Sequence, residues 1–263
     1  MIPRDLTNLA SKRLLPRSDK ISRIPINTGM KISEALDSTL AYHSFLNPAV
    51  WEKQSMKPEI RKALLDIATL FFESLDHKPK MLDIVVMGSM ANYNWSKYSD
   101  VDLHIVVDIE DVEREGLVFR DYLYAQKIIW NKEHDIKIKE YDVEIYVQDV
   151  SEPYHSAGVY SLLDDAWVST PKYFKPDIND TQVVRKAEYL ANEISAIEET
   201  DCTNSPRIEQ LKEKIKKMRQ AGLDKDGEFS VGNLVFKVLR NNGLIDILRQ
   251  KCNTATDSCY SVE

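Results

Sequence analysis

The sequence predicts a protein of α/β (α+β) class, in which a mixed sheet with its helices is followed by a helical domain at the C-terminus. Two apolar segments, 82–87 and 101–107, have the length and composition of buried strands. Residues 142–149 alternate polar and apolar side chains, which is typical of a half-buried strand. From about residue 182 onward, apolar residues recur at helical spacing.

Two helices are expected before the first strand. In residues 31–47, polar and apolar residues alternate at roughly helical spacing, which predicts a short helix that ends before Pro48. Residues 57–76 form a stronger pattern, because Pro58 can occupy the first turn and the apolar residues fall on one stripe. That stripe consists of Ile60, Leu64, Ile67, Leu70 and Phe71.

The middle of the chain is expected to alternate between strands and helices. A short helix from residue 90 to about 95 follows the first strand, and a helix over 117–131 follows the second, after an acidic loop. Residues 135–139 and 142–149 both alternate and are separated by a tight turn, so they indicate a hairpin. Residues 150–180 contain three prolines and show no periodicity, so we expect an irregular segment there.

Four helices are expected in the C-terminal part. The first begins near residue 182, and Ser205-Pro206 is a good N-cap and N1 pair for the second. The third covers 231–241 and is stopped by Asn242-Gly243. The fourth covers 244–252. We therefore expect a basic N-terminal arm over 1–30, a sheet-bearing domain over 31–180 and a helical domain over 181–255.

Composition limits the class of protein. The net charge of −7 over 263 residues argues against a protein coated in nucleic acid, although local basic patches remain possible. The first 25 residues contain six Lys or Arg, and RNA is one partner that this arm could contact. Three cysteines without metal-ligand spacing suggest reduced thiols, and no apolar run is long enough to cross a membrane. We expect a cytoplasmic protein, and the oligomeric state is left open.

A small-residue turn and two aspartates suggest phosphate and metal chemistry. Gly88-Ser89 directly follows an apolar strand, and ten residues separate Ser89 from Asp100. Asp100 and Asp102 lie two residues apart on the second strand, so their side chains share one face. Backbone amides at such a turn can bind phosphates, and paired carboxylates can bind a divalent ion.

The later alternating strand can supply a third carboxylate. Glu144 and Asp142 both lie on its polar face, and either of them could be this third carboxylate. If this strand lies beside the second strand, three or four carboxylates share one sheet face. Such a cluster is costly unless a cation neutralises it, and Mg²⁺ prefers oxygen ligands and substrate phosphates.

The order Gly88-Ser89, ten residues, Asp100-Val-Asp102 resembles the signature of the DNA polymerase β-like nucleotidyltransferase superfamily. The match is closest to the minimal nucleotidyltransferases, and the run after Met90 is similar to nucleotidyltransferases predicted in bacteria and phages. The resemblance implies a palm domain that binds an NTP such as ATP, with Mg²⁺ or Mn²⁺ held by Asp100, Asp102 and Glu144. It also implies nucleotide-binding roles for Gly88, Ser89, Lys97 and Ser99.

The chain departs from that family pattern at two positions. The family's third carboxylate is usually an Asp flanked by apolar residues; Glu144 has those neighbours, so the resemblance favours it over Asp142, but it supplies Glu. Asn92 stands where many minimal members carry Arg. The implied activity is transfer of a nucleoside monophosphate from an NTP to a hydroxyl acceptor by two-metal catalysis, with RNA as one candidate acceptor. The alternative is a catalytically silent nucleotide-binding or partner-binding regulatory module with the same fold.

Other residues have simpler interpretations. We expect a structural hydrogen bond for His104 and a packing role for Trp95, rather than roles in chemistry. The aromatic residues His155, Tyr160 and Trp167 either cap a nucleobase or fasten their segment to the domain, and we favour the second. The lysines between 212 and 219 either contact an RNA backbone or, as we favour, form the solvated face of an amphipathic helix.

Overall fold

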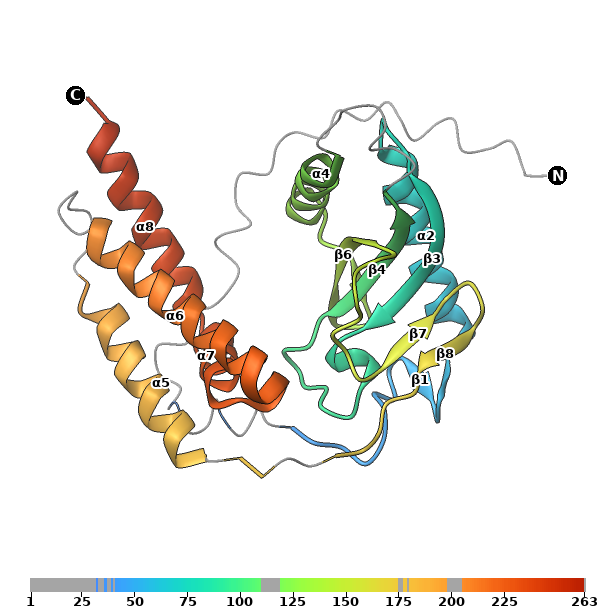
Figure 1. Ribbon diagram of the computed structural model, residues 1–263, viewed down its shortest axis with the longest axis horizontal. Helices are drawn as coiled ribbons and strands as arrows, with labels where there is room; N and C mark the ends of the chain where they lie inside the picture. Colours follow the sequence, from blue (N-terminus) through green and yellow to red (C-terminus); the bar gives the residue numbers. More distant parts are fainter. Residues whose placement is uncertain are drawn as a thin grey trace.

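In the computed structural model, a mixed sheet of six strands, in the order β5-β6-β4-β3-β7-β8, is formed by residues 80–169 (Figure 1). Described are residues 32, 36, 39, 41–109, 119–174, 177–178, 180–197 and 205–262. The strands are β3 (Lys80–Met87), β4 (Val101–Asp108), β5 (Lys137–Ile138), β6 (Tyr141–Asp149), β7 (Val159–Ser161) and β8 (Ala166–Ser169). Only β4 and β6 pair in parallel, and the other neighbours are antiparallel. The predicted mixed sheet is therefore confirmed.

Two helices cover one face of this sheet. Helix α2 (Pro58–Ser74) buries Leu64 and Phe71 against alternate residues of β4, including Leu103 and Ile105. Helix α4 (Phe119–Glu133) joins β4 to β6 and contributes to the same core. Because α2 and α4 occupy this face, the even-numbered residues of β4 face the other way, toward the helical part of the chain.

Helix α4 also lies along the edge of β6. Asn131 donates a hydrogen bond to the carbonyl of Ile145 (2.9 Å) and accepts one from its amide (3.0 Å). These two bonds satisfy a backbone that β5, only two residues long, leaves without a neighbouring strand. The side chain thereby holds α4 beside the part of β6 that carries Glu144.

The prediction of an irregular segment over 150–180 is wrong for part of its length. Strands β7 and β8 form a hairpin that extends the sheet beyond β3. They are three and four residues long, and all of β7 is buried, so no alternation exposes them in the sequence. Trp167 stacks on Trp51 at 4.8 Å and Tyr160 meets both rings edge-on, so these aromatic residues fasten the hairpin to the domain.

Smaller differences occur near the start of the chain. Strands β1 (Trp51–Glu52) and β2 (Ser55–Met56) form an additional short hairpin. The short helix expected over 90–95 is a 3-10 turn, η2 (Ser89–Ala91). Residues 41–47 are not helical. The basic arm over 1–30 and most of the acidic loop after β4 lie outside the described residues.

From residue 180 onward, the described part of the chain folds as four α-helices with a separate core. They are α5 (Asp180–Ser195), α6 (Ser205–Asp226), α7 (Val231–Asn241) and α8 (Leu244–Tyr260). Ser230 caps α7 by accepting a hydrogen bond from the amide of Asn233, and Gly243 takes a left-handed conformation before α8. Helix α8 continues past the expected end at 252, because Cys252 and Ala255 extend its buried stripe.

The helical domain also holds a residue from before the sheet. Leu36 is buried in the core of these helices rather than in the core of the sheet domain. Cys252 is a free thiol, whereas Cys259 is disulfide-bonded, so the expectation of reduced thiols is wrong at Cys259. Among the described residues, no helix is long and apolar enough to cross a membrane.

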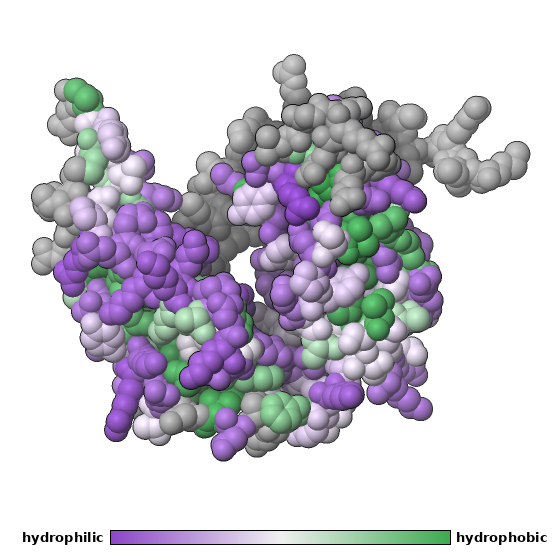
Figure 2. Space-filling model, in the orientation of Figure 1, coloured by the Kyte–Doolittle hydropathy of each residue, from purple (hydrophilic) through white to green (hydrophobic). Residues whose placement is uncertain are grey.

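The sheet domain and the helical domain meet over a small area. Asn94 donates a hydrogen bond to Glu228 at 3.1 Å, and Phe229, in the turn η4 (Gly227–Phe229), contacts Tyr42 and Phe174. Above this contact the surface is hollowed between the two domains (Figure 2). The open face of β4 and helix α7 lie on opposite sides of that hollow (Figure 1).

Candidate functional site

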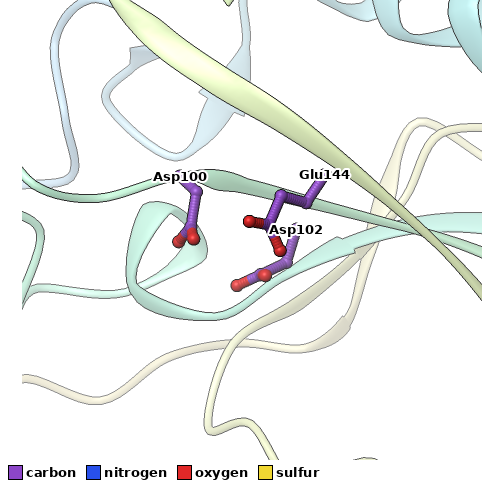
Figure 3. A group of neighbouring side chains, drawn as sticks. All are labelled: Asp100, Asp102 and Glu144. Atoms are coloured by element: carbon purple, nitrogen blue, oxygen red, sulfur yellow. The ribbon is translucent and has the colours of Figure 1, made fainter. Parts of the chain in front are cut away.

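Three carboxylates converge on the open face of the sheet. Asp100 directly precedes β4, Asp102 lies within it, and the parallel register places Glu144 of β6 opposite Asp102. One oxygen from each of the three lies within 4.8 Å of the others, and the side chains point toward one another (Figure 3). The competing residue, Asp142, is exposed and hydrogen-bonded to Lys137 at the sheet edge. The structure therefore brings Glu144, and not Asp142, to the two aspartates.

The electrostatics of this cluster favour a bound cation. Burial, followed by the charges of Asp100 and Glu144, raises the pKa of Asp102 to about 8. Burial also raises the pKa of Asp100, while Arg240 lowers it. Since all three donors are carboxylate oxygens, the set suits a hard divalent ion such as Mg²⁺. A bound cation would allow all three groups to remain ionised at neutral pH.

The turn between β3 and η2 requires a glycine. Gly88 has φ of 76°, and a Cβ atom at this position would lie 1.9 Å from Oδ2 of Asp102. Only a residue without a side chain allows the turn to approach the carboxylates so closely. The Gly88 amide donates to Oγ of Ser156 at 3.1 Å, which ties the turn to the segment before β7.

Two of the remaining predicted residues meet at this turn, and one does not. The hydroxyls of Ser89 and Ser99 are hydrogen-bonded at 2.7 Å, and Ser99 also accepts from the amide of Ser96. The loop from η2 to β4 is therefore closed on itself beside Asp100. Lys97 is exposed on this loop, with its ammonium 4.9 Å from the centroid of the Tyr98 ring. No described contact joins Lys97 to the carboxylates.

The sequence analysis missed cationic residues on the helices that surround the carboxylates. Lys237 and Arg240 of α7 both lower the pKa of Asp100 and Asp102. Lys127 of α4 interacts with Glu144 and Asp102, and burial lowers its own pKa. The spacing of Lys237 and Arg240 places them on one face of a helix that is otherwise largely apolar. Two cations on one face of an apolar helix could have been noticed in the sequence. The sequence alone did not show that this face of α7 lies near the carboxylates.

Glu144 is held by a neighbouring tyrosine. The Tyr146 hydroxyl donates to Oε2 of Glu144 at 2.6 Å, and burial, followed by this hydrogen bond, raises the pKa of Tyr146. Lys127 lies 3.6 Å from the centroid of the Tyr146 ring, and the His104 ring stacks on that ring with centroids 4.7 Å apart. The tyrosine is thus fixed by its neighbours, and it restricts the carboxylate of Glu144 in turn.

The residues expected to have structural roles do have structural contacts. His104 is hydrogen-bonded to Gln148 at 2.9 Å, and burial lowers its pKa to about 4, so its imidazole is neutral at pH 7. Trp95 stacks on His43 at 3.7 Å and donates to the carbonyl of Phe45. His155 is exposed.

The stretch of chain that carries the three carboxylates is similar to a known family of domains. Residues 69–160, which include all three carboxylates, match the family model of the nucleotidyltransferase domain, and this confirms the resemblance over that stretch. No curated protein matches the sequence. The solved structure of Elizabethkingia meningoseptica CdnE cyclic dinucleotide synthase with GTP and Apcpp is 11% identical, with a TM-score of 0.27. That match covers 88% of this chain and 98% of the other, and a likeness this weak carries no functional information.

Proposed function

We propose that the protein transfers a nucleoside monophosphate from an NTP to a hydroxyl acceptor, using Mg²⁺ or Mn²⁺ held by Asp100, Asp102 and Glu144. One observation carries the proposal. Three carboxylates from adjacent strands lie together beside the Gly88 turn, within a stretch that matches a nucleotidyltransferase domain. A protein that only needed a stable sheet would gain nothing from grouping these charges on its open face.

Each part of the site has a task in this reaction. Two divalent ions bound by the carboxylates would stabilise the attacking and leaving oxygens of an in-line displacement. The acceptor oxygen forms a bond to the α-phosphorus as the bond to pyrophosphate breaks, and Glu144 is placed to accept the proton of the acceptor hydroxyl. The Gly88-Ser89 turn binds the leaving phosphates through the Ser89 amide, since the Gly88 amide donates to Ser156, and Ser99 supports the turn.

Cations on the helices complete the balance of charge. Lys237 and Arg240 approach the carboxylates from α7, and a triphosphate between the domains would lie within their field. Lys97, being exposed on the loop before Asp100, meets the triphosphate only if that loop rearranges on binding. Helix α7 is therefore the main source of positive charge for the nucleotide.

The acceptor is the open part of the proposal. RNA is the class to test first, because residues 1–30 and the lysines of α6 are basic, although the net charge of −7 weighs against it. A protein side chain, a small molecule and a second nucleotide are the other hydroxyl-bearing classes. The expectation of a cytoplasmic location remains a prediction.

The test uses NTPs labelled at the α-phosphate, with Mg²⁺ or Mn²⁺ and a mixed pool of RNA and cell extract. Transfer of label identifies the acceptor, and release of pyrophosphate reports turnover. The double variant Asp100→Ala, Asp102→Ala should abolish labelling, whereas Asp142→Ala, at the exposed sheet edge, should not. Metal-dependent NTP binding without pyrophosphate release under any acceptor would instead identify a silent nucleotide-binding module.

A further inference from the structure

A cavity of about 340 Å³ lies where the sheet domain meets the helical domain. Its walls include Asn92, Asn94, Phe174, Glu228 and Phe229. The volume falls within the range of roughly 300–1,000 Å³ that is common for small-molecule sites. The aromatic rings offer flat apolar surfaces, and the amides and the carboxylate offer hydrogen-bonding groups, which together suit a planar polar ligand.

The cavity adjoins the carboxylate site. Its wall at Asn92 follows the Gly88-Ser89 turn directly, and the Asn92 amide donates to the carbonyl of Ser89 at 3.1 Å. The ammonium of Lys237 is close enough to both the cavity and the carboxylate site to be attracted by the charges of Glu228 and Asp100. A nucleotide with its phosphates at the turn therefore has a cavity for its base within reach on the same side of the fold.

Glu228 is the charged acceptor of this cavity. It accepts one hydrogen bond from Asn94, at Oε2, and no described cation lies within ion-pairing distance of it. Its neighbour Tyr42 also lines the cavity, and burial followed by the charge of Glu228 raises the pKa of that hydroxyl. A carboxylate can accept about four hydrogen bonds, so Glu228 has capacity left for a ligand that brings donors.

We propose, on the premise of the transferase function above, that this cavity binds the base of the nucleotide and that Glu228 makes guanine the preferred base. Guanine presents two adjacent donors, N1–H and N2–H, which match the two oxygens of a carboxylate. Adenine and cytosine place one amino donor beside an acceptor nitrogen, and uracil places one N–H between two carbonyl oxygens. Each of these bases would set an acceptor against the half-buried carboxylate of Glu228 and leave one of its oxygens without a donor.

The test measures the dissociation constants of GTP, ATP, CTP, UTP and inosine triphosphate with Mg²⁺ for the full chain. GTP should bind about 10- to 100-fold more tightly than the other three common NTPs, as expected for a hydrogen bond to a charged group. Inosine triphosphate lacks the 2-amino group and should lose most of that advantage. Glu228→Gln should bring GTP to within a few-fold of ATP, while Glu213→Gln, the same change on the exposed face of α6, should leave the order unchanged.

The outcomes separate the two proposals. The assignment of Glu228 is overturned if the unaltered protein binds all the NTPs equally, or if the preference for guanine persists in Glu228→Gln. In either case, labelled transfer from any NTP leaves the transferase proposal intact. A guanine preference that Glu228→Gln removes, without transfer to any acceptor, supports the cavity and contradicts the transferase. Failure of all five nucleotides to bind overturns both.

Discussion

At the scale of single residues, the strength of the candidate site rests on how Glu144 is held. The Glu144 side chain is one methylene longer than the Asp that the family resemblance implies. It therefore has one more rotatable bond whose freedom must be restricted. Tyr146 supplies that restriction through a hydrogen bond of 2.6 Å, and Lys127 and His104 fix the ring of Tyr146. The contacts around Glu144 therefore offset the flexibility of the longer side chain.

Replacing Tyr146 with Phe removes this hydrogen bond while keeping the ring. We expect a loss of about 10- to 100-fold in metal affinity or transfer rate, as is usual when the partner of a metal-binding carboxylate is removed. Labelled transfer and Mg²⁺ titration measure the effect, and the thermal midpoint should change little. Tyr124→Phe, at a tyrosine of α4 that is 62% exposed, is the matched control. Equal activity of Tyr146→Phe and wild type would show that Glu144 needs no such support.

The raised pKa of Asp102 predicts an unusual dependence of stability on pH. Its value in the folded protein is about 8, compared with 3.8 for the ordinary group, so the folded state binds more protons than the unfolded state between these values. The free energy of unfolding in EDTA should therefore fall as pH rises from about 4 to about 8, by at most about 1.4 kcal/mol per pH unit.

Thermal melts in EDTA and in Mg²⁺ across this range check the prediction. Because the metal binds the deprotonated carboxylates, Mg²⁺ should restore stability most strongly near the upper end of the range. Asp102→Asn cannot ionise, and its stability in EDTA should change less with pH than that of the wild type. Stability in EDTA that rises with pH from about 4 to about 8 would contradict the buried, metal-free cluster described above.

At the scale of elements, the turn after β3 sets the distance between phosphates and carboxylates. Gly88→Ala places a methyl group where Oδ2 of Asp102 lies, so either the turn or the carboxylate must move. A displacement of about 1 Å in such a site can reduce the rate about 10²-fold, and we expect a loss of this order in labelled transfer. Gly243→Ala also changes a glycine with positive φ, at the start of α8 and far from the turn in sequence, and it should retain activity. A fully active Gly88→Ala would exclude the turn from phosphate binding.

The elements also show what the sequence could and could not predict. Strand β4 was predictable as an apolar segment of strand length and β6 as an alternating one, and the shared face of Asp100 and Asp102 followed from their spacing of two residues. Strands β7 and β8 were not, because their aromatic side chains are buried against Trp51, more than a hundred residues earlier in the chain. The family resemblance favoured Glu144 over Asp142, but the parallel register that places Glu144 opposite Asp102 is not determined by sequence spacing.

At the scale of the whole molecule, the sheet domain and the helical domain have separate hydrophobic cores. Negative charges on the first domain face positive charges on the second across the hollow between them. The carboxylates belong to the sheet domain, whereas Lys237 and Arg240 belong to the helical domain. Sequence periodicity predicted most helices and strands of each domain, but it did not predict how the two domains sit relative to each other. The domains meet mainly around Asn94 and Phe229, and no sequence pattern marks these contacts. The site is therefore a property of the assembled pair of domains and not of either one.

This division predicts that cations of the helical domain control nucleotide binding without contributing to folding. Lys237 and Arg240 repel each other and Arg219, and burial lowers the pKa of Lys237. These costs oppose their attraction to Asp100 and Asp102, so we expect them to contribute little net stability to the free protein. The double variant Lys237→Met, Arg240→Gln should keep or raise the thermal midpoint, yet weaken binding of Mg²⁺-NTP by roughly 10-fold or more. The double variant Lys217→Met, Arg249→Gln, at exposed positions of α6 and α8, controls for the loss of two positive charges. If the double variant binds NTP as tightly as the wild type in calorimetry, the triphosphate does not reach α7, and the hollow between the domains is not the nucleotide site.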